Sequence, residues 1–557
     1  MKKILALLLS TLMLCTCLFS CEELLFDEDY TGDSIQGGLF DNLFEDGTNE
    51  TEKNNTTNKA TNKATNNSTE TNEYSKETFT AVVPVDTLDF DGEPLTILHR
   101  DAYNVQREWY SETIEDELSE MILIRNEWVS KKLNIEVNYM PLASSNYEDC
   151  LDLFTAAIRE DVDTDAHNYD IVANYAYAGA NVAVRDYIAD LNDKEVFPYF
   201  EFSLPCWNQA MVRNTMANGQ LFYITGDINL STFDKSIVMF LNKTMYNEKK
   251  SNTDPDDLQD IAIEGTWDYE DLYRWTTVFD DTNGEDGAQH DDFYGISTGF
   301  GSIPTDALPY AWDLEYLTEE PDGTHSYNIV GNQKIENAIV KAQNLLNGAI
   351  SAGVNNADNT CSCSLGGYSE PIAHFANDKC VFAIHLLYAN NEDNVMIRSM
   401  DSEFGLLPMP KYDESQENYG TTAHDSYTLM TVIDHSESSI PTRGEEISAY
   451  LQYSTEETYT GIRGYYVNKI VKPKYFGTNN SNDSVSKSIE IFNMIADNIE
   501  FDFLSVYAPQ LHGVLNSCWR NVVTGSSTYT TAEAAYEADK ANFDTALDEV
   551  DSWLGLK

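Results

Sequence analysis

The chain is poor in basic residues. In its 557 residues, 34 Lys and Arg stand against 93 Asp and Glu, which gives a formal net charge of −59. A surface of this charge repels phosphate backbones and anionic lipid headgroups, and no basic stripe with interleaved aromatic residues reverses the effect locally. We therefore expect no nucleic-acid partner.

Cysteine is also scarce, with nine residues in the whole chain. Cys15 and Cys17 fall in an N-terminal apolar run, and the cysteines after residue 21 are widely spaced. Wide spacing in a long chain argues against a disulfide scaffold, so we expect at most one or two bridges. Cys361 and Cys363, with His374 nearby, lack the paired spacing of a zinc site, and a surface loop is the favoured interpretation.

The sequence lacks the usual catalytic motifs: a Gly-x-Ser-x-Gly elbow, a His-Glu-x-x-His pair, a P-loop and a Gly-x-Gly-x-x-Gly turn. With 93 acidic residues, carboxylate pairs suited to a glycosidase occur by chance. Residues 280–287 are as rich in oxygen as a calcium loop, but Asp286 stands where an EF-hand requires glycine. We therefore predict no enzyme, no cofactor and no metal site.

One long apolar run exists, over residues 4–19, and it follows two lysines. A basic start, a short apolar stretch and a small residue at the end indicate a secretory signal that is too short to span a bilayer comfortably. Residues 18–21 (LFSC) resemble the bacterial lipobox, which implies cleavage after Ser20 and lipidation of Cys21. An ordinary signal with a cysteine nearby is the alternative.

Residues 21–86 carry little apolar surface, and the tetrapeptide at 57–60 is repeated at 61–64. Such a segment cannot offset its ordering entropy, so we predict a disordered, lipid-anchored linker with an end-to-end distance of about 40–50 Å. The remaining residues, roughly 470, exceed the size at which single cores stop growing, so we expect at least two lobes.

Strand-like and helix-like patterns alternate along this remainder. Short apolar strands at 95–98 and 135–139 flank a helical spacing at 115–133, and further strands are expected at 169–173 and 236–241. This order favours parallel-dominated sheets that are covered by helices on both faces. Ligands of such sheets bind at the carboxyl ends of the strands.

Polar and aromatic residues follow several of the expected strands, which suits a carbohydrate. Sugar rings stack on Tyr and Trp, and their hydroxyl groups need partners that accept and donate hydrogen bonds. Each aromatic residue could instead belong to the core. The candidates are Asp101, Tyr103, Asn174, Tyr175, Asp227, Tyr310 and Trp312.

Five segments in a fixed order resemble a known family. They are residues 219–246, 265–272, 375–384, 404–410 and 538–550. Together they resemble the extracellular solute-binding proteins of the sugar-binding ABC-importer class, which are related in layout to maltose-binding protein. The resemblance runs from residue 92 to the C-terminus.

The resemblance implies an α/β fold in a two-lobed, periplasmic-binding-protein-like clamp, with mostly parallel sheets, flanking helices and a hinge between the lobes. Lobe one would comprise residues 87–236 and 416–463, and lobe two residues 242–405 and 465–557. Hinge segments would lie at 237–241, at 406–415 and near 464.

The resemblance also implies a set of ligand-binding residues. Lobe one would supply Asp101, Tyr103, Asn174, Tyr175 and Asp425, lobe two Tyr310, Trp312 and Tyr388, and Trp207 and Asp227 follow lobe-one segments. Tyr388 falls where the family often places a stacking aromatic residue. The acidic loop at 280–292, the Cys361 insertion and Cys206-Trp207, where relatives carry a tryptophan pair, depart from the family and leave the ligand open.

The implied function is that of a lipid-anchored substrate-binding component of an ABC importer. It would capture a sugar or oligosaccharide by hinge closure and deliver it to a membrane permease. It would sit at the cell membrane facing the extracellular side, or the periplasm if an outer membrane is present. The alternatives are a receptor for a peptide or another polar solute, and a surface protein that binds or hydrolyses glycans without transport.

Overall fold

The computed structural model describes residues 81–557 apart from 102–107, 115–116, 145–146, 280–292, 299–301, 352–368, 391–396, 398 and 477–479. Several predictions fall outside these residues: the signal, most of the linker, Cys21, Tyr103, the acidic loop at 280–292, Cys361 and Cys363. In the part of the chain that is described, no helix combines the length and the apolar character that a membrane crossing needs.

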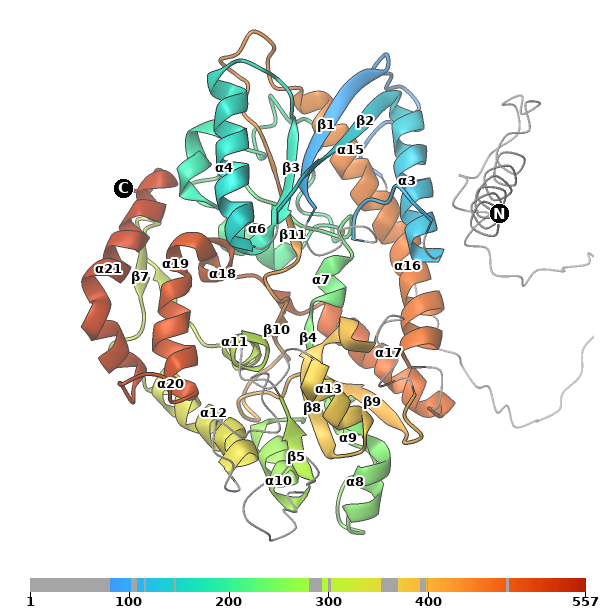
Figure 1. Cartoon of the computed structure of the whole chain (residues 1–557), viewed down its shortest axis with the longest axis vertical. Helices are drawn as coiled ribbons and strands as arrows, with labels where there is room; N and C mark the ends of the chain where they lie inside the picture. Colours follow the sequence, from blue (N-terminus) through green and yellow to red (C-terminus); the bar gives the residue numbers. More distant parts are fainter. Residues whose placement is uncertain are drawn as a thin grey trace, which may run out of the picture. The chain divides into compact units, whose positions relative to one another are not determined.

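The first sheet is built from four described strands, in the order β11-β3-β1-β2 (Figure 1). Strand β1 pairs in parallel with both β2 and β3, and β11 pairs with β3 in the antiparallel direction. The strands are β1 (Glu93–Arg100), β2 (Ile135–Leu142), β3 (Ile171–Tyr175) and β11 (Thr428–Val432). Helices α3 (Glu117–Leu133) and α4 (Tyr147–Asp163) connect the parallel strands, as the alternating sequence pattern predicts.

The core of this first part forms where α3 and α15 (Gly444–Glu457) pack together beside the sheet. Leu95 and Ile97 of β1 are 1% exposed and share one hydrophobic cluster with Val129 and Leu133 of α3. Val129 and Leu133 are four residues apart, so they lie on the same face of the helix. Residues two apart on a strand likewise share a face, which explains the pairing of these two apolar patterns.

The folded body begins earlier than the sequence indicates. Val83 is 4% exposed and belongs to the first core, and the backbone N–H of Val82 donates to Oε1 of Glu456 at 3.1 Å. Residues 82 and 83 are therefore part of the packed structure, although the predicted linker ends at 86.

The second sheet has the order β5-β8-β4-β9. Its strands are β5 (Tyr294–Ser297), β8 (Cys380–Leu386), β4 (Ile237–Asn242) and β9 (Phe404–Leu407). Only the β5–β8 pairing is parallel, while β4 is antiparallel to both β8 and β9. The α/β class is confirmed, but mostly parallel pairing describes the first sheet only. Ile237, the first residue of β4, lies opposite Leu386, the last residue of β8, so the two strands run in opposite directions.

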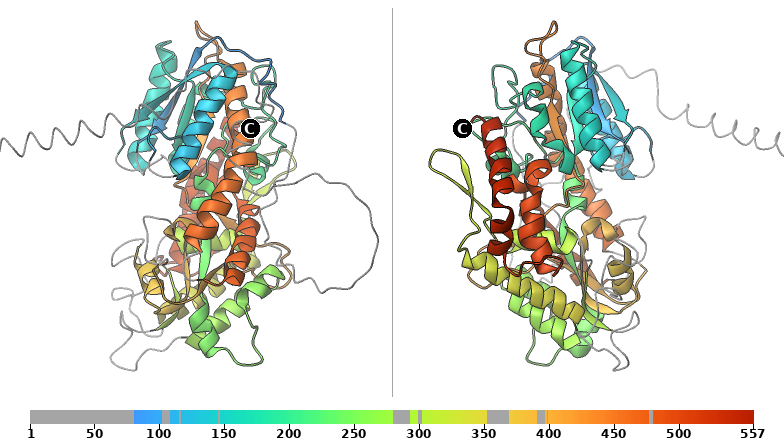
Figure 2. Two further views of the ribbon diagram at one scale, coloured as in Figure 1. Left: turned by 90° about the vertical axis from the view of Figure 1, so that its right-hand side faces the viewer. Right: turned by 60° about the vertical axis from the view of Figure 1, so that its left-hand side comes forward.

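The chain passes between the two sheets at more than one place. The first passage is at Lys235 and Ser236, directly before β4. A second involves β10 (Thr421–Thr422), which pairs in parallel with β12 (Ile499–Glu500). A third is a long helical run, which lies on the right-hand side of Figure 1 and faces the viewer in the left view of Figure 2.

This helical run continues α15 through two π-helical stretches that flank α16 (Arg463–Tyr465). The stretches are Thr458–Ile462 and Tyr466–Tyr475, and α17 (Asn482–Ala496) follows and packs on β9. The predicted crossing near 464 falls inside α16. The predicted hinge at 237–241 lies inside β4, and the segment at 406–415 begins inside β9. The lobe boundaries stay a prediction.

The C-terminal part is helical. It comprises α18 (Phe503–Val506), α19 (Ala508–Leu515), α20 (Asn521–Val523) and α21 (Ala532–Trp553). The helix predicted at 538–550 lies within α21. Helices α18 and α19 contact α5 (Ala176–Gly179), which directly follows β3, so the C-terminus packs against the first part of the chain.

Candidate functional site

The carboxyl ends of β1 and β3 meet the start of β11 at one side of the first sheet, which we call the first-sheet edge. Tyr175 is the last residue of β3, and Asp425 precedes β11 by three positions. The backbone N–H of Tyr177 donates to the carbonyl of Asp425 at 3.2 Å. Asp101, which directly follows β1, is exposed. The structure therefore brings together three of the residues that the sequence predicts at a ligand site.

A buried pair of charges fixes this edge. The guanidinium of Arg100 lies 2.8 Å from Oε2 of Glu108, and the two side chains are 0% and 8% exposed. The hydroxyl of Thr428 donates to the same carboxylate oxygen at 2.7 Å, and the ammonium of Lys235 lies 3.6 Å from the other oxygen. The guanidinium of Arg100 also lies 5.2 Å from the ring centroid of Tyr175.

Arg100 and Glu108 flank residues 102–107, the segment that contains the predicted site residue Tyr103. Because both side chains are buried and bonded to each other, Arg100 and Glu108 themselves lie together at the first-sheet edge.

The passage between the sheets runs beside the same edge. The N–H of His424 donates to the carbonyl of Lys235 at 2.9 Å, and the N–H of Leu387 donates to the carbonyl of Ser236 at 3.0 Å. Asp425 follows His424, and Tyr388 follows Leu387 in a 3-10 turn, Leu387–Asn390. The backbones of Asp425 and Tyr388 therefore reach one point of the chain from different sheets. The side chain of Tyr388 lies outside the described residues.

Asp425 is the partly exposed carboxylate of this edge. Its side chain is 35% exposed, and Oδ1 lies 3.2 Å from Nδ1 of His424. A carboxylate in this position can accept hydrogen bonds from hydroxyl groups of a ligand while Oδ1 stays in contact with the imidazole of His424.

Tyr175 of the first-sheet edge is buried, with 6% of its surface exposed, and three other predicted residues are buried as well. Asn174 is 3% exposed, and its Oδ1 accepts a hydrogen bond from the N–H of Tyr175 at 2.7 Å. Trp207 is 2% exposed, and its indole N–H donates to Oε1 of Gln452 at 2.9 Å. Trp312 is 0% exposed and packs edge-on against Trp519. In this structure none of the three presents appreciable surface to a ligand.

Asp227 is held in an ion pair away from the surface. Its Oδ2 lies 3.4 Å from a guanidinium nitrogen of Arg463, and the two side chains are 9% and 8% exposed. Burial raises the pKa of Asp227 to about 6, against the opposing effect of Arg463. Arg463 belongs to α16, so this pair ties the long helical run to the first part of the chain.

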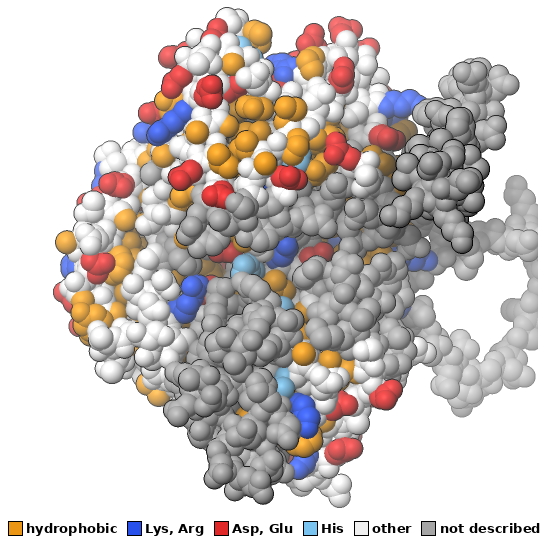
Figure 3. Space-filling model, viewed as in Figure 1, with side chains coloured by type: hydrophobic (Ala, Val, Ile, Leu, Met, Phe, Trp, Pro, Cys, Tyr) orange, Lys and Arg blue, Asp and Glu red, His pale blue; other side chains and the backbone are white. Residues whose placement is uncertain are grey.

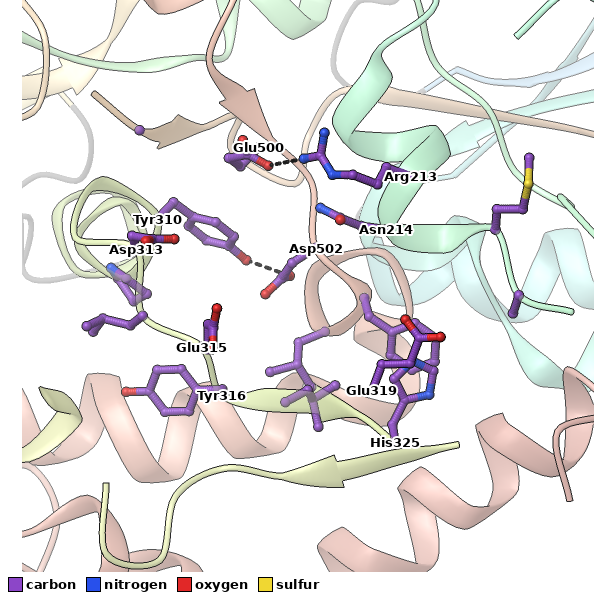
Figure 4. Close-up of a pocket in the computed structure, with 18 of the residues that line it drawn as sticks. Arg213, Asn214, Tyr310, Asp313, Glu315, Tyr316, Glu319, His325, Glu500 and Asp502 are labelled. Carbon is purple, nitrogen blue, oxygen red and sulfur yellow. Dashed lines mark hydrogen bonds and ion pairs between the residues drawn. The ribbon is translucent and has the colours of Figure 1, made fainter. Parts of the chain in front are cut away.

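The last predicted residue, Tyr310, lies at a cleft of about 1110 Å³ (Figure 4). We call it the α6–β12 cleft. Its walls are the end of α6 (Gln209–Thr215), the end of α11 (Ser302–Ala311), the β6–β7 hairpin (317–327), residues 416–420 and the segment from β12 to α18.

Two polar contacts cross the walls of this cleft. The hydroxyl of Tyr310 donates to Oδ1 of Asp502 at 2.9 Å, and a guanidinium nitrogen of Arg213 lies 3.3 Å from Oε2 of Glu500. Figure 4 shows both contacts at the top and centre of the cavity, with Glu315 extending toward it from below. Burial raises the pKa of Asp502 and of Glu500 above the ordinary range, and the neighbouring carboxylates add to the effect at Glu500.

Sequence reasoning missed the polar residues of β12, although a signal exists. Residues 498–502 alternate between polar and apolar side chains, which is typical of a strand with one wet face. Asn498, Glu500 and Asp502 line the cleft, whereas Ile499 and Phe501 are 3% and 1% exposed.

The described residues hold no group of three or more His, Cys, Asp or Glu side chains that is placed to bind a metal ion. Cys150, Cys206 and Cys518 are buried free thiols.

Comparison with known proteins gives matches at the level of structure. No family model matches the chain, and no curated protein matches its sequence. The GacH receptor of Streptomyces glaucescens, solved unliganded and with acarbose, is 12% identical with a TM-score of 0.47, covering 83% of this chain and 99% of that chain. Maltose-bound MalE3 of T. maritima is 13% identical with a TM-score of 0.46, covering 82% and 99%.

A third solved structure is the galacto-N-biose-/lacto-N-biose I-binding protein of the ABC transporter from Bifidobacterium longum. It is 10% identical with a TM-score of 0.47, covering 85% of this chain and 100% of that chain. The ligands of these three solved structures are acarbose, maltose and lacto-N-biose.

Proposed function

We propose that the chain is the lipid-anchored substrate-binding component of an ABC importer, and that it captures a sugar or oligosaccharide at the first-sheet edge. The observation that carries this proposal is the convergence there of Asp101, Tyr175 and Asp425, which come from three separate segments, beside the passage at Lys235 and Ser236. Ligands of open α/β sheets bind at this end of the strands.

The capture step follows from the position of the passage. The residues directly before Asp425 and Tyr388, His424 and Leu387, donate backbone hydrogen bonds to the carbonyls of Lys235 and Ser236. Asp425 from the first sheet and Tyr388 from the second therefore follow residues that are bonded to this passage. Rotation about this passage would change the separation of the two sides. A ligand that contacts both sides stabilises the closed arrangement by its differential affinity for the two states.

The chemistry of the edge supports a ligand with many hydroxyl groups. Asp101 and Asp425 are acceptors for hydroxyl hydrogen bonds, and Tyr388 would supply a ring face on which the C–H face of a sugar stacks. The closed form would then dock on a membrane permease. Cys21 would hold the chain at the outer side of the cell membrane, or in the periplasm where an outer membrane is present.

The test is a binding measurement on the purified chain, followed by recovery of the ligand. Maltose, maltotriose and lacto-N-biose, which solved neighbours bind, are suitable first probes. Asp425→Asn should weaken sugar binding by about 1–3 kcal/mol, since it removes a charged acceptor. The matched control is Asp163→Asn, which makes the same change at the exposed last residue of α4.

Each outcome separates a class of function. A sugar that binds and is recovered unchanged supports a receptor, whereas a shortened sugar would show a glycosidase. Binding of peptides in place of every sugar would overturn the substrate. Equal losses in Asp425→Asn and Asp163→Asn would overturn the location of the site.

A further inference from the structure

The α6–β12 cleft is separate from the first-sheet edge. Successive side chains of a strand point to opposite faces. In the extended segment 498–502, which contains β12, Asn498, Glu500 and Asp502 line the cleft, while the ring of Phe501 lies 4.8 Å from that of Tyr427. Tyr427 directly precedes β11, so β12 and this aromatic pair stand between the cleft and the first-sheet edge.

Side chains of α6 and of its N-cap residue, Asn208, hold β12 in this position. The amide of Asn214 donates to the carbonyl of Phe501 at 3.1 Å, and that of Asn208 donates to the carbonyl of Ile499 at 3.4 Å. The other edge of β12 pairs with β10. Because both edges of β12 are bonded, the cleft has a fixed wall on this side.

The size of the cleft suits a small organic solute. Its volume of about 1110 Å³ is slightly above the range for small-molecule sites, ~300–1,000 Å³. Figure 4 shows the ring of Tyr310 beside the cavity, between Asp313 and Asp502. Five amide side chains also line it, and amides both donate and accept hydrogen bonds, as ligand hydroxyl groups require.

The charges of the lining residues indicate which kind of ligand the cleft would bind. Seven carboxylates line the cleft, and the basic side chains among its described lining residues are Arg213 and His325. Arg213 is engaged by Glu500 at 3.3 Å, and Nδ1 of His325 is engaged by Asp551 at 2.7 Å. The lining therefore favours a ligand that brings its own positive charge.

The raised pKa of Glu500 agrees with this polarity. Its first cause is burial, which the nearby guanidinium of Arg213 opposes, and Asp502 and Asp313 raise the pKa further. A cation in the cleft would favour the charged form of these carboxylates.

We propose that the α6–β12 cleft is a second solute site, distinct from the first-sheet edge, and that it takes an amino sugar. The amides and Tyr310 meet the hydroxyl groups and the ring, and the carboxylates meet the protonated amino groups. Glu315 and Glu319, both exposed residues of the cleft lining, are the principal partners for those amino groups.

The experiment compares three trisaccharides of similar size on the purified full chain by calorimetry. The probes are the trisaccharides of glucosamine and of N-acetylglucosamine, and maltotriose. We expect the glucosamine trisaccharide to bind at this cleft, and the double variant Glu315→Gln, Glu319→Gln to weaken it by about tenfold per carboxylate removed. Loss of affinity for the N-acetylated trisaccharide should be much smaller.

The matched control is the double variant Glu537→Gln, Glu549→Gln, which removes the same charge from exposed positions of α21. Equal weakening in both double variants would show that the amino sugar responds only to the overall charge, and it would overturn the proposal. Equal affinity for the three trisaccharides would overturn the amino-sugar assignment.

The cleft and the first-sheet edge can be told apart by one more variant. Asp425→Asn, which tests the proposed sugar site, should leave the affinity for the glucosamine trisaccharide unchanged. If Asp425→Asn weakens that trisaccharide as much as the Glu315→Gln, Glu319→Gln variant does, the cleft is not a separate site. Single Glu315→Gln, expected to cost about tenfold, provides the same comparison if the double variant does not fold.

Discussion

The carboxylate of Glu108 lies 2.8 Å from the guanidinium of Arg100, and both side chains are buried at the first-sheet edge. The hydroxyl of Thr428 shares the same carboxylate oxygen. These contacts join the end of β1, the start of β11 and the residue that follows the segment at 102–107.

Truncation of this carboxylate should be costly. Glu108→Ala leaves the Arg100 charge buried with fewer partners, so we expect the free energy of unfolding to fall by about 3–5 kcal/mol. Urea unfolding measures the change. Glu500→Ala removes the carboxylate from the ion pair with Arg213, whose side chain is 63% exposed, and should cost about 0–1 kcal/mol. A similar loss in the two variants would contradict the role assigned to Arg100 and Glu108.

Asp227 should make stability depend on pH in a definite direction. Burial raises its pKa from 3.8, the ordinary value of an aspartate side chain, to about 6 in the folded chain, so between these values the folded state binds more protons than the unfolded state. The contribution of Asp227 to the free energy of unfolding is therefore fully present below pH ~4. It is lost as the pH rises through ~6, which lowers the free energy of unfolding by up to about 3 kcal/mol.

The measurement compares the free energy of unfolding of the wild-type chain and of Asp227→Asn from pH 4 to pH 7. The variant cannot titrate at this position. As the pH rises, the free energy of unfolding of the wild type should therefore fall relative to that of the variant. A constant difference would show that Asp227 is already ionised throughout this range.

The first sheet could be predicted from local pattern. Short apolar strands on either side of an amphipathic helix leave few arrangements, and the parallel pairing of β1 with β2 and β3 follows from the connecting helices α3 and α4. The rule that strands joined by a helix pair in parallel does not predict the second sheet. The direction of β4 depends on where the chain passes between the sheets at Lys235 and Ser236, and that is a tertiary property.

Part of the candidate site could also be predicted from local sequence pattern. Asp101, Tyr175 and Asp425 stand at strand ends, where position along the chain fixes position in space. Trp207 and Trp312 are candidates by their positions in the sequence, but a tryptophan ring is equally suited to stack on a sugar and to fill a core. Only the packing of Trp207 against Gln452 and of Trp312 against Trp519 distinguishes the two roles, and both contacts join residues far apart in the sequence.

Trp207 should therefore behave as a core residue. Its ring packs against Phe202 with centroids 5.4 Å apart, and Trp207→Ala would open a cavity and remove one of the two hydrogen bonds that Oε1 of Gln452 accepts. We expect a loss of about 3–5 kcal/mol in the free energy of unfolding. The control is Val340→Ala, at a side chain that is 54% exposed, with a change within about 0.5 kcal/mol. A Trp207→Ala chain that is as stable as the control, but has lost sugar affinity, would restore the ligand role.

Cys21 should decide where the protein resides in the cell. If the thiol carries the lipid, Cys21→Ala removes the lipid anchor, so the variant should leave the membrane fraction. The measurement is incorporation of a labelled fatty acid, together with the distribution of the chain between membrane and soluble fractions. Ser20→Thr, which keeps the thiol and a small hydroxyl residue before it, is the control and should still be labelled. A wild-type chain that takes up no label, or a Cys21→Ala chain that remains in the membrane fraction, would mean that another feature of the N-terminal segment holds the protein there.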